Sequence, residues 1–145
     1  GGAPMGWISP RRLLILNLIL LLTLVASCGG DATEKAPIEL QQSERDQIAT
    51  TAQAYVASLQ ARDMTTAKML LIRGVPDATV TKSMDTVRNE GYRLETLGSV
   101  TADAEGAEIL LNLTDKDGKT VERKLEFRRV DGTWVVYSPH LKPLT

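Results

Sequence analysis

The spacing of hydrophobic side chains changes once along this sequence, near Gly91, from a helical period to strand-like alternation. Before Gly91, apolar residues recur every three or four positions from residue 44 onward, which predicts helices. After Gly91, apolar and polar residues alternate, which predicts strands with one buried face. The expected order of elements is therefore a group of helices followed by a group of antiparallel strands.

Three helices are predicted in the first group. The first is expected over about 44–61, with Ser43 as the N-cap and start of a capping box. Asp63 is expected to cap a short second helix that ends near Gly74. A third helical segment follows, and Gly91 should end it because glycine readily adopts the left-handed conformation at a helix C-terminus.

Four strands are predicted in the second group, joined by tight turns. The turns are expected near Gly106, at Asp117-Gly118 and at Asp131-Gly132, because Asp-Gly favours two-residue hairpins. The expected inner face of the first strand holds Tyr92, Leu94, Thr96, Gly98 and Val100, whereas Arg93, Glu95, Leu97 and Ser99 form the outer face. The fold class is therefore α+β, with N-terminal helices packed on a four-stranded antiparallel meander.

The N-terminal part of the chain has a different character. Two arginines, Arg11 and Arg12, precede an apolar run from Leu13 to Ala26. This run is short for a membrane-spanning helix and suits a signal peptide. The following Val-Ala-Ser-Cys-Gly resembles a bacterial lipobox. The resemblance implies cleavage before Cys28, with diacylglycerol on its sulfur and an acyl chain on its new amine.

The expected organisation is a signal peptide over 1–27, a lipidated cysteine and tether over 28–42, and a folded domain over 43–145. The tether assignment rests on glycines, a proline and mixed charge. The alternative for the N-terminal part is an uncleaved signal anchor in which Cys28 is an incidental buried thiol. Under the lipobox interpretation, the protein is lipid-anchored in the cell membrane or outer membrane and faces the periplasm or the cell exterior.

The folded domain resembles the cystatin-like α+β roll, which includes nuclear-transport-factor-like and ketosteroid-isomerase-like proteins. Three segments carry the resemblance: 54–63 (AYVASLQARD), 67–71 (AKMLL) and 127–136 (FRRVDGTWVV). The nearest likeness is to small uncharacterised lipoproteins of that superfamily. The resemblance implies a curved sheet whose concave face and covering helices enclose a cone. The segment between Gly74 and Gly91 departs from the fuller roll, which often has a strand there.

Composition excludes several classes of function. The chain has 17 Lys+Arg against 18 Asp+Glu, so it lacks the basic excess typical of nucleic-acid binders. One cysteine and one histidine exclude a multi-thiolate or multi-imidazole metal site within the chain. His140 follows Pro139 beyond the last predicted strand and is expected to be solvated. We therefore expect no catalytic residues, no metal and no cofactor beyond the lipid on Cys28.

Six residues remain as candidates for a pocket or a contact surface. These are Tyr55, Met69, Arg123, Arg129, Trp134 and Tyr137. Arg123 or Arg129 could hold an anionic ligand by paired hydrogen bonds, or could lie at the sheet margin with its stem over apolar surface. The aromatic residues could line a pocket or belong to the core.

Three functions are compatible with these features. The first is a non-enzymatic lipoprotein that binds a protein partner or is accessory to a membrane assembly. The second is a small-molecule binder that uses the cone of the roll. The third, least supported by the residues, is a ketosteroid-isomerase-like enzyme. The expected partners are the membrane, through the lipid anchor, and a membrane-protein complex or a small ligand, with no nucleic acid.

Overall fold

A computed structural model describes residues 36–145; the expected signal peptide and Cys28 lie outside the described residues. Three helices form first: α2 (Gln42–Ala61), α3 (Met64–Leu70) and α4 (Asp77–Glu90). Asp63 caps α3 by accepting a hydrogen bond from the Thr66 amide at 3.1 Å, as predicted. Gly91 ends α4 in the left-handed conformation, with φ of 67°. Among the described residues, no helix has the length and apolar character needed to cross a membrane.

The predicted start of the first helix was wrong by two residues. The N-cap of α2 is Gln41, and Ser43 already lies within the first turn. The capping box consists of Gln41 and Glu44, because the Glu44 carboxylate reaches back to the Gln41 amide at 3.4 Å. Glutamate three residues after the cap satisfies a backbone donor that the helix itself leaves free.

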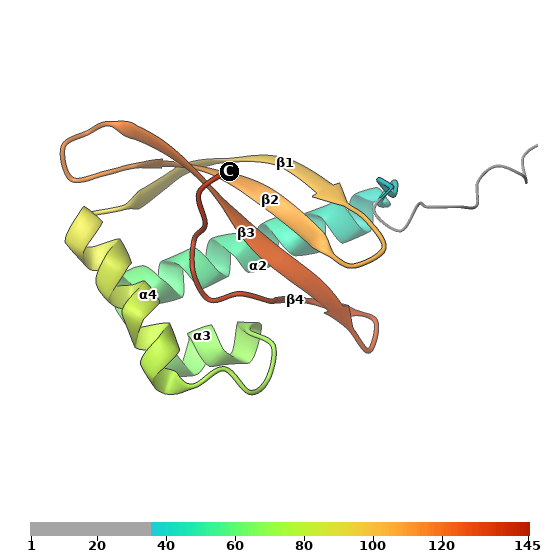
Figure 1. Cartoon of the computed structure of the whole chain (residues 1–145), viewed down its shortest axis with the longest axis horizontal. Helices are drawn as coiled ribbons and strands as arrows, with labels where there is room; N and C mark the ends of the chain where they lie inside the picture. Colours follow the sequence, from blue (N-terminus) through green and yellow to red (C-terminus); the bar gives the residue numbers. More distant parts are fainter. Residues whose placement is uncertain (1–35) are drawn as a thin grey trace, which may run out of the picture. The chain divides into compact units, whose positions relative to one another are not determined.

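Four strands follow and form one sheet, in which they lie side by side in the same order as along the chain (Figure 1). They are β1 (Arg93–Ala102), β2 (Ala107–Thr114), β3 (Thr120–Val130) and β4 (Thr133–Val136). Each pairs antiparallel with its neighbour, so the predicted meander is confirmed. Asp131 and Gly132 both have positive φ, 51° and 81°, which matches the twist required of a two-residue hairpin.

The predicted alternation along β1 was wrong between two register shifts, around Leu97, whereas Val100 beyond them packs against the core as predicted. The register with β2 shifts between Leu94 and Thr96 and again between Leu97 and Val100. Leu97 consequently pairs with the fully buried Leu111 and packs against the core rather than lying on the polar face. Irregularities of this kind add residues to one strand, so side chains beyond them change faces.

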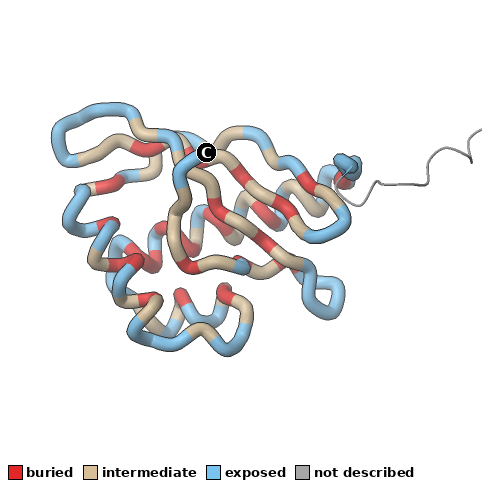
Figure 2. Tube along the Cα trace, viewed as in Figure 1, coloured by how far each residue is buried: buried red, intermediate tan, exposed pale blue. Residues whose placement is uncertain are grey.

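The helices cover one face of the sheet and form an α+β roll. In Figure 1, α2 runs along the sheet, whereas α3 and α4 lie together at one end. Buried and half-buried residues alternate along β2, as Figure 2 shows, so one face of that strand is covered. The space between α2 and the sheet is filled by fully buried side chains, including Tyr55, Phe127 and Leu125. The concave face is thus occupied by the protein's own core.

The segment after β4 returns to the sheet. Lys142 exchanges two backbone hydrogen bonds with Lys124, at 2.8 and 2.9 Å. Between β4 and Lys142 the chain passes close to the helices, where the Tyr55 hydroxyl donates to the Pro139 carbonyl at 2.7 Å. The C-terminal segment therefore connects the middle of β3 with α2.

Candidate functional site

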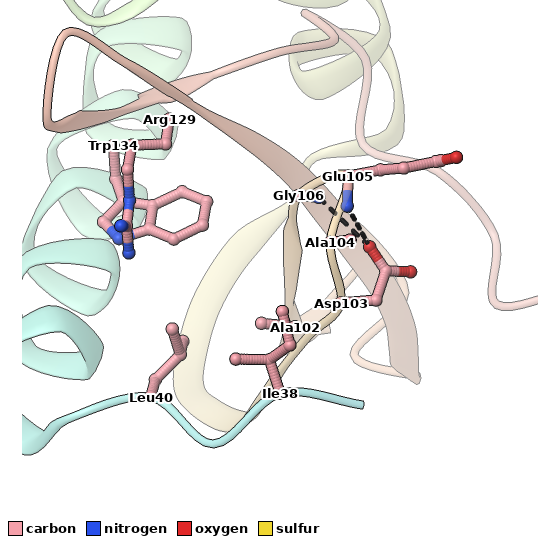
Figure 3. Close-up of a pocket in the computed structure, with 9 residues that line it drawn as sticks. All are labelled: Ile38, Leu40, Ala102, Asp103, Ala104, Glu105, Gly106, Arg129 and Trp134. Atoms are coloured by element: carbon pink, nitrogen blue, oxygen red, sulfur yellow. Dashed lines mark hydrogen bonds between the residues drawn. The ribbon is translucent and has the colours of Figure 1, made fainter. Parts of the chain in front are cut away.

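A pocket of about 240 Å³ lies where the first described residues meet the sheet (Figure 3). We call it the Trp134 pocket. Its lining residues come from the segment before α2, from the turn between β1 and β2, and from the hairpin end of β3 and β4. They are Ile38, Leu40, Ala102, Asp103, Ala104, Glu105, Gly106, Arg129 and Trp134.

Hydrogen bonds donated by backbone amides shape two walls of the pocket. The Ile38 amide donates to the Ala102 carbonyl at 2.8 Å, so the segment before α2 is attached to the end of β1. The Asp103 carboxylate accepts from the amides of Glu105 and Gly106, at 2.8 and 3.1 Å, and thereby shapes the adjoining turn. An aspartate that bonds to amides two and three residues later is a common way to fix a tight turn.

Gly106 allows the turn to approach β3 closely. A Cβ atom at this position would lie 2.4 Å from the Phe127 carbonyl oxygen. That separation is below any tolerable contact, so a side chain here would force the turn away from β3. The pocket therefore depends on glycine at this point of the turn.

A charged cluster on α2 and β3 supports the opposite wall. Arg129 forms an ion pair with Glu44, and its guanidinium lies 4.8 Å from the centre of the Trp134 ring. The Trp134 indole donates to the same Glu44 carboxylate at 3.3 Å. Burial opposes ionisation of Glu44, but hydrogen bonds from Trp134 and Gln41 and the charge of Arg129 outweigh it and hold its pKa below the ordinary value.

These contacts determine the chemistry that the pocket offers. Leu40 and Trp134 are buried, and Ile38 is 47% exposed beside them. The positive charge of Arg129 is already balanced by Glu44. The walls can therefore accept an apolar group, whereas an anionic ligand would have to compete with Glu44 for Arg129.

The structure brings together two of the six residues selected from the sequence. Arg129 and Trp134 line the same pocket. Arg123 lies six residues earlier on β3, about 20 Å away along the strand. There it donates to the Tyr92 hydroxyl at 3.2 Å, with its guanidinium 5.8 Å from the centre of the Tyr92 ring.

The other three residues lie elsewhere. Tyr55 is fully buried in the core between α2 and the sheet. Met69 is on α3 and is 74% exposed. Tyr137 is 39% exposed, beneath the Arg128 guanidinium at 3.9 Å.

The prediction that His140 is a solvated tail residue was wrong. It is half-buried, and its Nδ1 lies 2.5 Å from the hydroxyl of Ser83 on α4. Ser83 is only 2% exposed and does not line the Trp134 pocket. The pair therefore fixes the C-terminal segment against α4. Within residues 36–145, no cluster of His, Cys, Asp or Glu side chains is arranged to hold a metal ion.

Sequence reasoning missed the remaining pocket residues. Ile38 and Leu40 fell within the presumed tether, where a single apolar pair between polar residues gives little signal. Glu44 lies at the start of a predicted helix, where an acidic residue is unremarkable, whereas the fold brings it to a tryptophan 90 residues later. No local pattern could have indicated that contact.

Comparison with known proteins gives no relative by sequence, since no protein-family model and no curated protein matches this chain. Solved structures, in contrast, include proteins that are similar to this chain at low sequence identity, among them the following three. A protein of unknown function with a cystatin-like fold from Nostoc punctiforme is 11% identical, with a TM-score of 0.49, over 68% of this chain and 90% of its own.

The other two structures are from Xanthomonas campestris. A candidate polyketide cyclase is 17% identical, with a TM-score of 0.40, over 65% of this chain and 91% of its own. A candidate calcium/calmodulin dependent protein kinase II association domain is also 17% identical, with a TM-score of 0.40, over 77% of this chain and 95% of its own.

Proposed function

We propose that this protein is a lipid-anchored, non-enzymatic binding protein that acts at the extracytoplasmic surface of a bacterial membrane, as an accessory to a membrane assembly. The observation that carries the proposal is the position of the Trp134 pocket. Ile38, one of its walls, is ten residues from Cys28, and ten residues span at most about 36 Å. A lipid on Cys28 would keep the pocket close to the headgroups and raise its effective concentration for membrane partners.

The anchor is tested by Cys28→Ala. We expect this variant to lose incorporation of labelled palmitate and to accumulate as uncleaved precursor in the membrane fraction. Ser27→Ala is the matched control, because a small residue remains before the cleavage site and lipidation should continue. Unchanged incorporation in Cys28→Ala would refute the lipobox interpretation.

The accessory role is tested by co-purification. The lipidated protein, extracted under mild detergent after brief crosslinking, should be recovered with the same membrane protein in repeated preparations. The Cys28→Ala variant should recover less of that protein. Recovery of monomer alone in every detergent would count against an accessory subunit.

A second candidate function is small-molecule binding, which the dimensions and apolar walls of the Trp134 pocket favour. The cone of the roll offers less support, because the buried side chains of Tyr55, Leu125 and Phe127 fill it. Native mass spectrometry and thermal-shift screening of the full chain test this candidate. A retained ligand that is lost on substituting a pocket residue would support it, and the absence of any shift across the screen would oppose it.

The non-enzymatic part of the proposal rests on the chemistry of the pocket lining. Asp103 is bonded to the amides of its own turn, and in Figure 3 its side chain and that of Glu105 extend away from Trp134. The imidazole of His140 lies beside Ser83, outside the lining. An isomerase would need a base aimed at the substrate within the cavity.

A further inference from the structure

We infer that the Trp134 pocket takes the apolar end of a membrane acyl chain. The inference rests on the proposed membrane tether and specifies what the pocket binds there. The same chemistry has two sources, the acyl chains carried by Cys28 itself and those of the surrounding lipids. The experiment below separates them.

The size of the pocket suits one chain end. Its volume is about 240 Å³. Pockets for complete drug-sized ligands are about 300–1,000 Å³. The Trp134 pocket thus has room for the last several carbons of a single chain, and the rest of the lipid would remain outside.

The walls favour an apolar occupant. Leu40 and Trp134 form the buried part, with 4% and 5% exposure, whereas Ile38 leaves 47% of its surface in water. A chain end placed against Ile38 would remove this apolar surface from water, which is favourable in proportion to the area covered.

The charges around the pocket disfavour capture of an anionic headgroup. Arg129 is paired with Glu44, so it presents no uncompensated positive charge to a ligand. Asp103 and Glu105, which also line the pocket, are acidic. An acyl chain entering with its methyl end first, and leaving its headgroup in solvent, avoids both features.

The neighbouring part of the chain offers no alternative occupant. Residues 29–35, GGDATEK, contain no large apolar side chain. In a lipidated protein the first large apolar groups before Ile38 would be the acyl chains on Cys28. The inferred site is therefore next to the only strongly hydrophobic group that such a tether would carry.

Trp134 provides the readout. The chain has two tryptophans, Trp7 and Trp134, so the full chain with Trp7→Phe has one fluorophore in the pocket wall. The lipidated protein is reconstituted in phosphatidylcholine vesicles and titrated with a monoacyl phosphatidylcholine that carries bromine at the end of its chain. Bromine quenches indole fluorescence on contact, so a chain end in the pocket should reduce Trp134 emission.

Three variants, each combined with Cys28→Ala so that no acyl chain of the protein's own can fill the pocket, make the result specific. Ile38→Asp should weaken the apparent affinity by about tenfold, because it places a charge in the apolar wall. Leu144→Asp is the matched control, since Leu144 is 41% exposed and does not line the pocket, and quenching should be unchanged. Ala104→Phe should reduce quenching by filling an exposed part of the pocket. Unchanged or stronger quenching in Ala104→Phe would mean surface contact alone and would overturn the inference.

The source of the chain is resolved by Cys28→Ala in the same vesicles. If the protein's own acyl chain occupies the pocket, the added lipid should quench Cys28→Ala but not the lipidated protein. If membrane lipid occupies it, both proteins should be quenched. Absence of quenching in both proteins overturns the inference, even where labelled palmitate shows that Cys28 is lipidated. Absence of labelled palmitate from the protein with Cys28 intact would instead refute the proposed function.

Discussion

The indole nitrogen of Trp134 donates a hydrogen bond to the carboxylate of Glu44 at 3.3 Å, and this contact joins β4 to the first turn of α2. The same oxygen pairs with Arg129, and the other carboxylate oxygen caps the helix at Gln41. One side chain thus completes a helix N-terminus, neutralises a guanidinium and orients a wall of the pocket. Several expected outcomes follow from this arrangement and from the core behind it.

The contribution of Glu44 to stability should depend on pH. Its pKa is lowered in the folded protein, so its stabilising effect is present above the unfolded pKa, near 4.5, and is lost as the pH falls through the folded value. Glu44→Gln should therefore be less stable than wild type at neutral pH, and the difference should shrink in acid. Urea denaturation at a series of pH values measures this difference.

The control for that experiment is Glu39→Gln, which makes the same exchange at a side chain that is 90% exposed. Its effect should be small at neutral pH. A constant difference between wild type and Glu44→Gln at all pH values would show that the ionised carboxylate does not carry the contact.

Trp134→Ala should destabilise the domain by about 3–5 kcal/mol, because it removes a large buried side chain and leaves a cavity. Trp134→Phe should cost less, since it retains a ring while losing the donor to Glu44. Urea denaturation followed by circular dichroism checks both variants without relying on the tryptophan signal. An unchanged midpoint for Trp134→Ala would mean that its burial contributes little.

Tyr55→Phe should destabilise the protein by about 1–3 kcal/mol, because the Pro139 carbonyl would lose its buried donor. Burial raises the pKa of the Tyr55 phenol, which therefore keeps its proton and remains a donor at any physiological pH. The matched control is Tyr137→Phe, at a tyrosine that is 39% exposed. Thermal unfolding should show little change for the control, and equal changes in the two variants would contradict the assigned role.

Gly106→Ala should be destabilising by about 1–3 kcal/mol, because its Cβ would lie 2.4 Å from the Phe127 carbonyl oxygen. Gly98→Ala is the comparison, since its Cβ would approach Leu110 only to 2.9 Å, a less severe overlap than 2.4 Å. The larger loss should occur in Gly106→Ala, together with changes in the amide spectrum of residues 102–106. A smaller loss than in Gly98→Ala would mean that the turn relaxes freely.

Local patterns predicted most of the fold. The Asp63 cap, the Gly91 helix end and the Asp131-Gly132 hairpin all depend on residues near one another in the sequence, and the structure confirms them. The predicted hairpin at Asp117-Gly118 also forms, but its turn is longer than two residues, because β2 ends at Thr114 and β3 begins at Thr120. The N-cap of α2 was wrong because two overlapping capping patterns were available, and Glu44 satisfied the earlier one. The inner face of β1 was wrong around Leu97 because alternation assumes an unbroken strand, whereas the first register shift turns Leu97 inward and the second returns Val100 to the core.

The candidate site was less accessible from the sequence than the fold. Alternation along the third predicted strand made Arg129 a candidate, its aromatic ring made Trp134 one, and both line the pocket. Arg123, selected by the same alternation, lies against Tyr92 toward the other end of β3. Alternation indicates which face a residue occupies, but it does not indicate which end of the sheet becomes hollow.

The sequence by itself determined the order of the elements, the turns between them and the chemistry that one histidine and one cysteine exclude. Only the tertiary structure decided that the cone is filled, that His140 bonds to Ser83, and that Glu44 meets Arg129 and Trp134. The physical reason is the range of the interactions. Propensity, capping and turn geometry act within a few residues, whereas a pocket depends on how distant segments meet when the core closes.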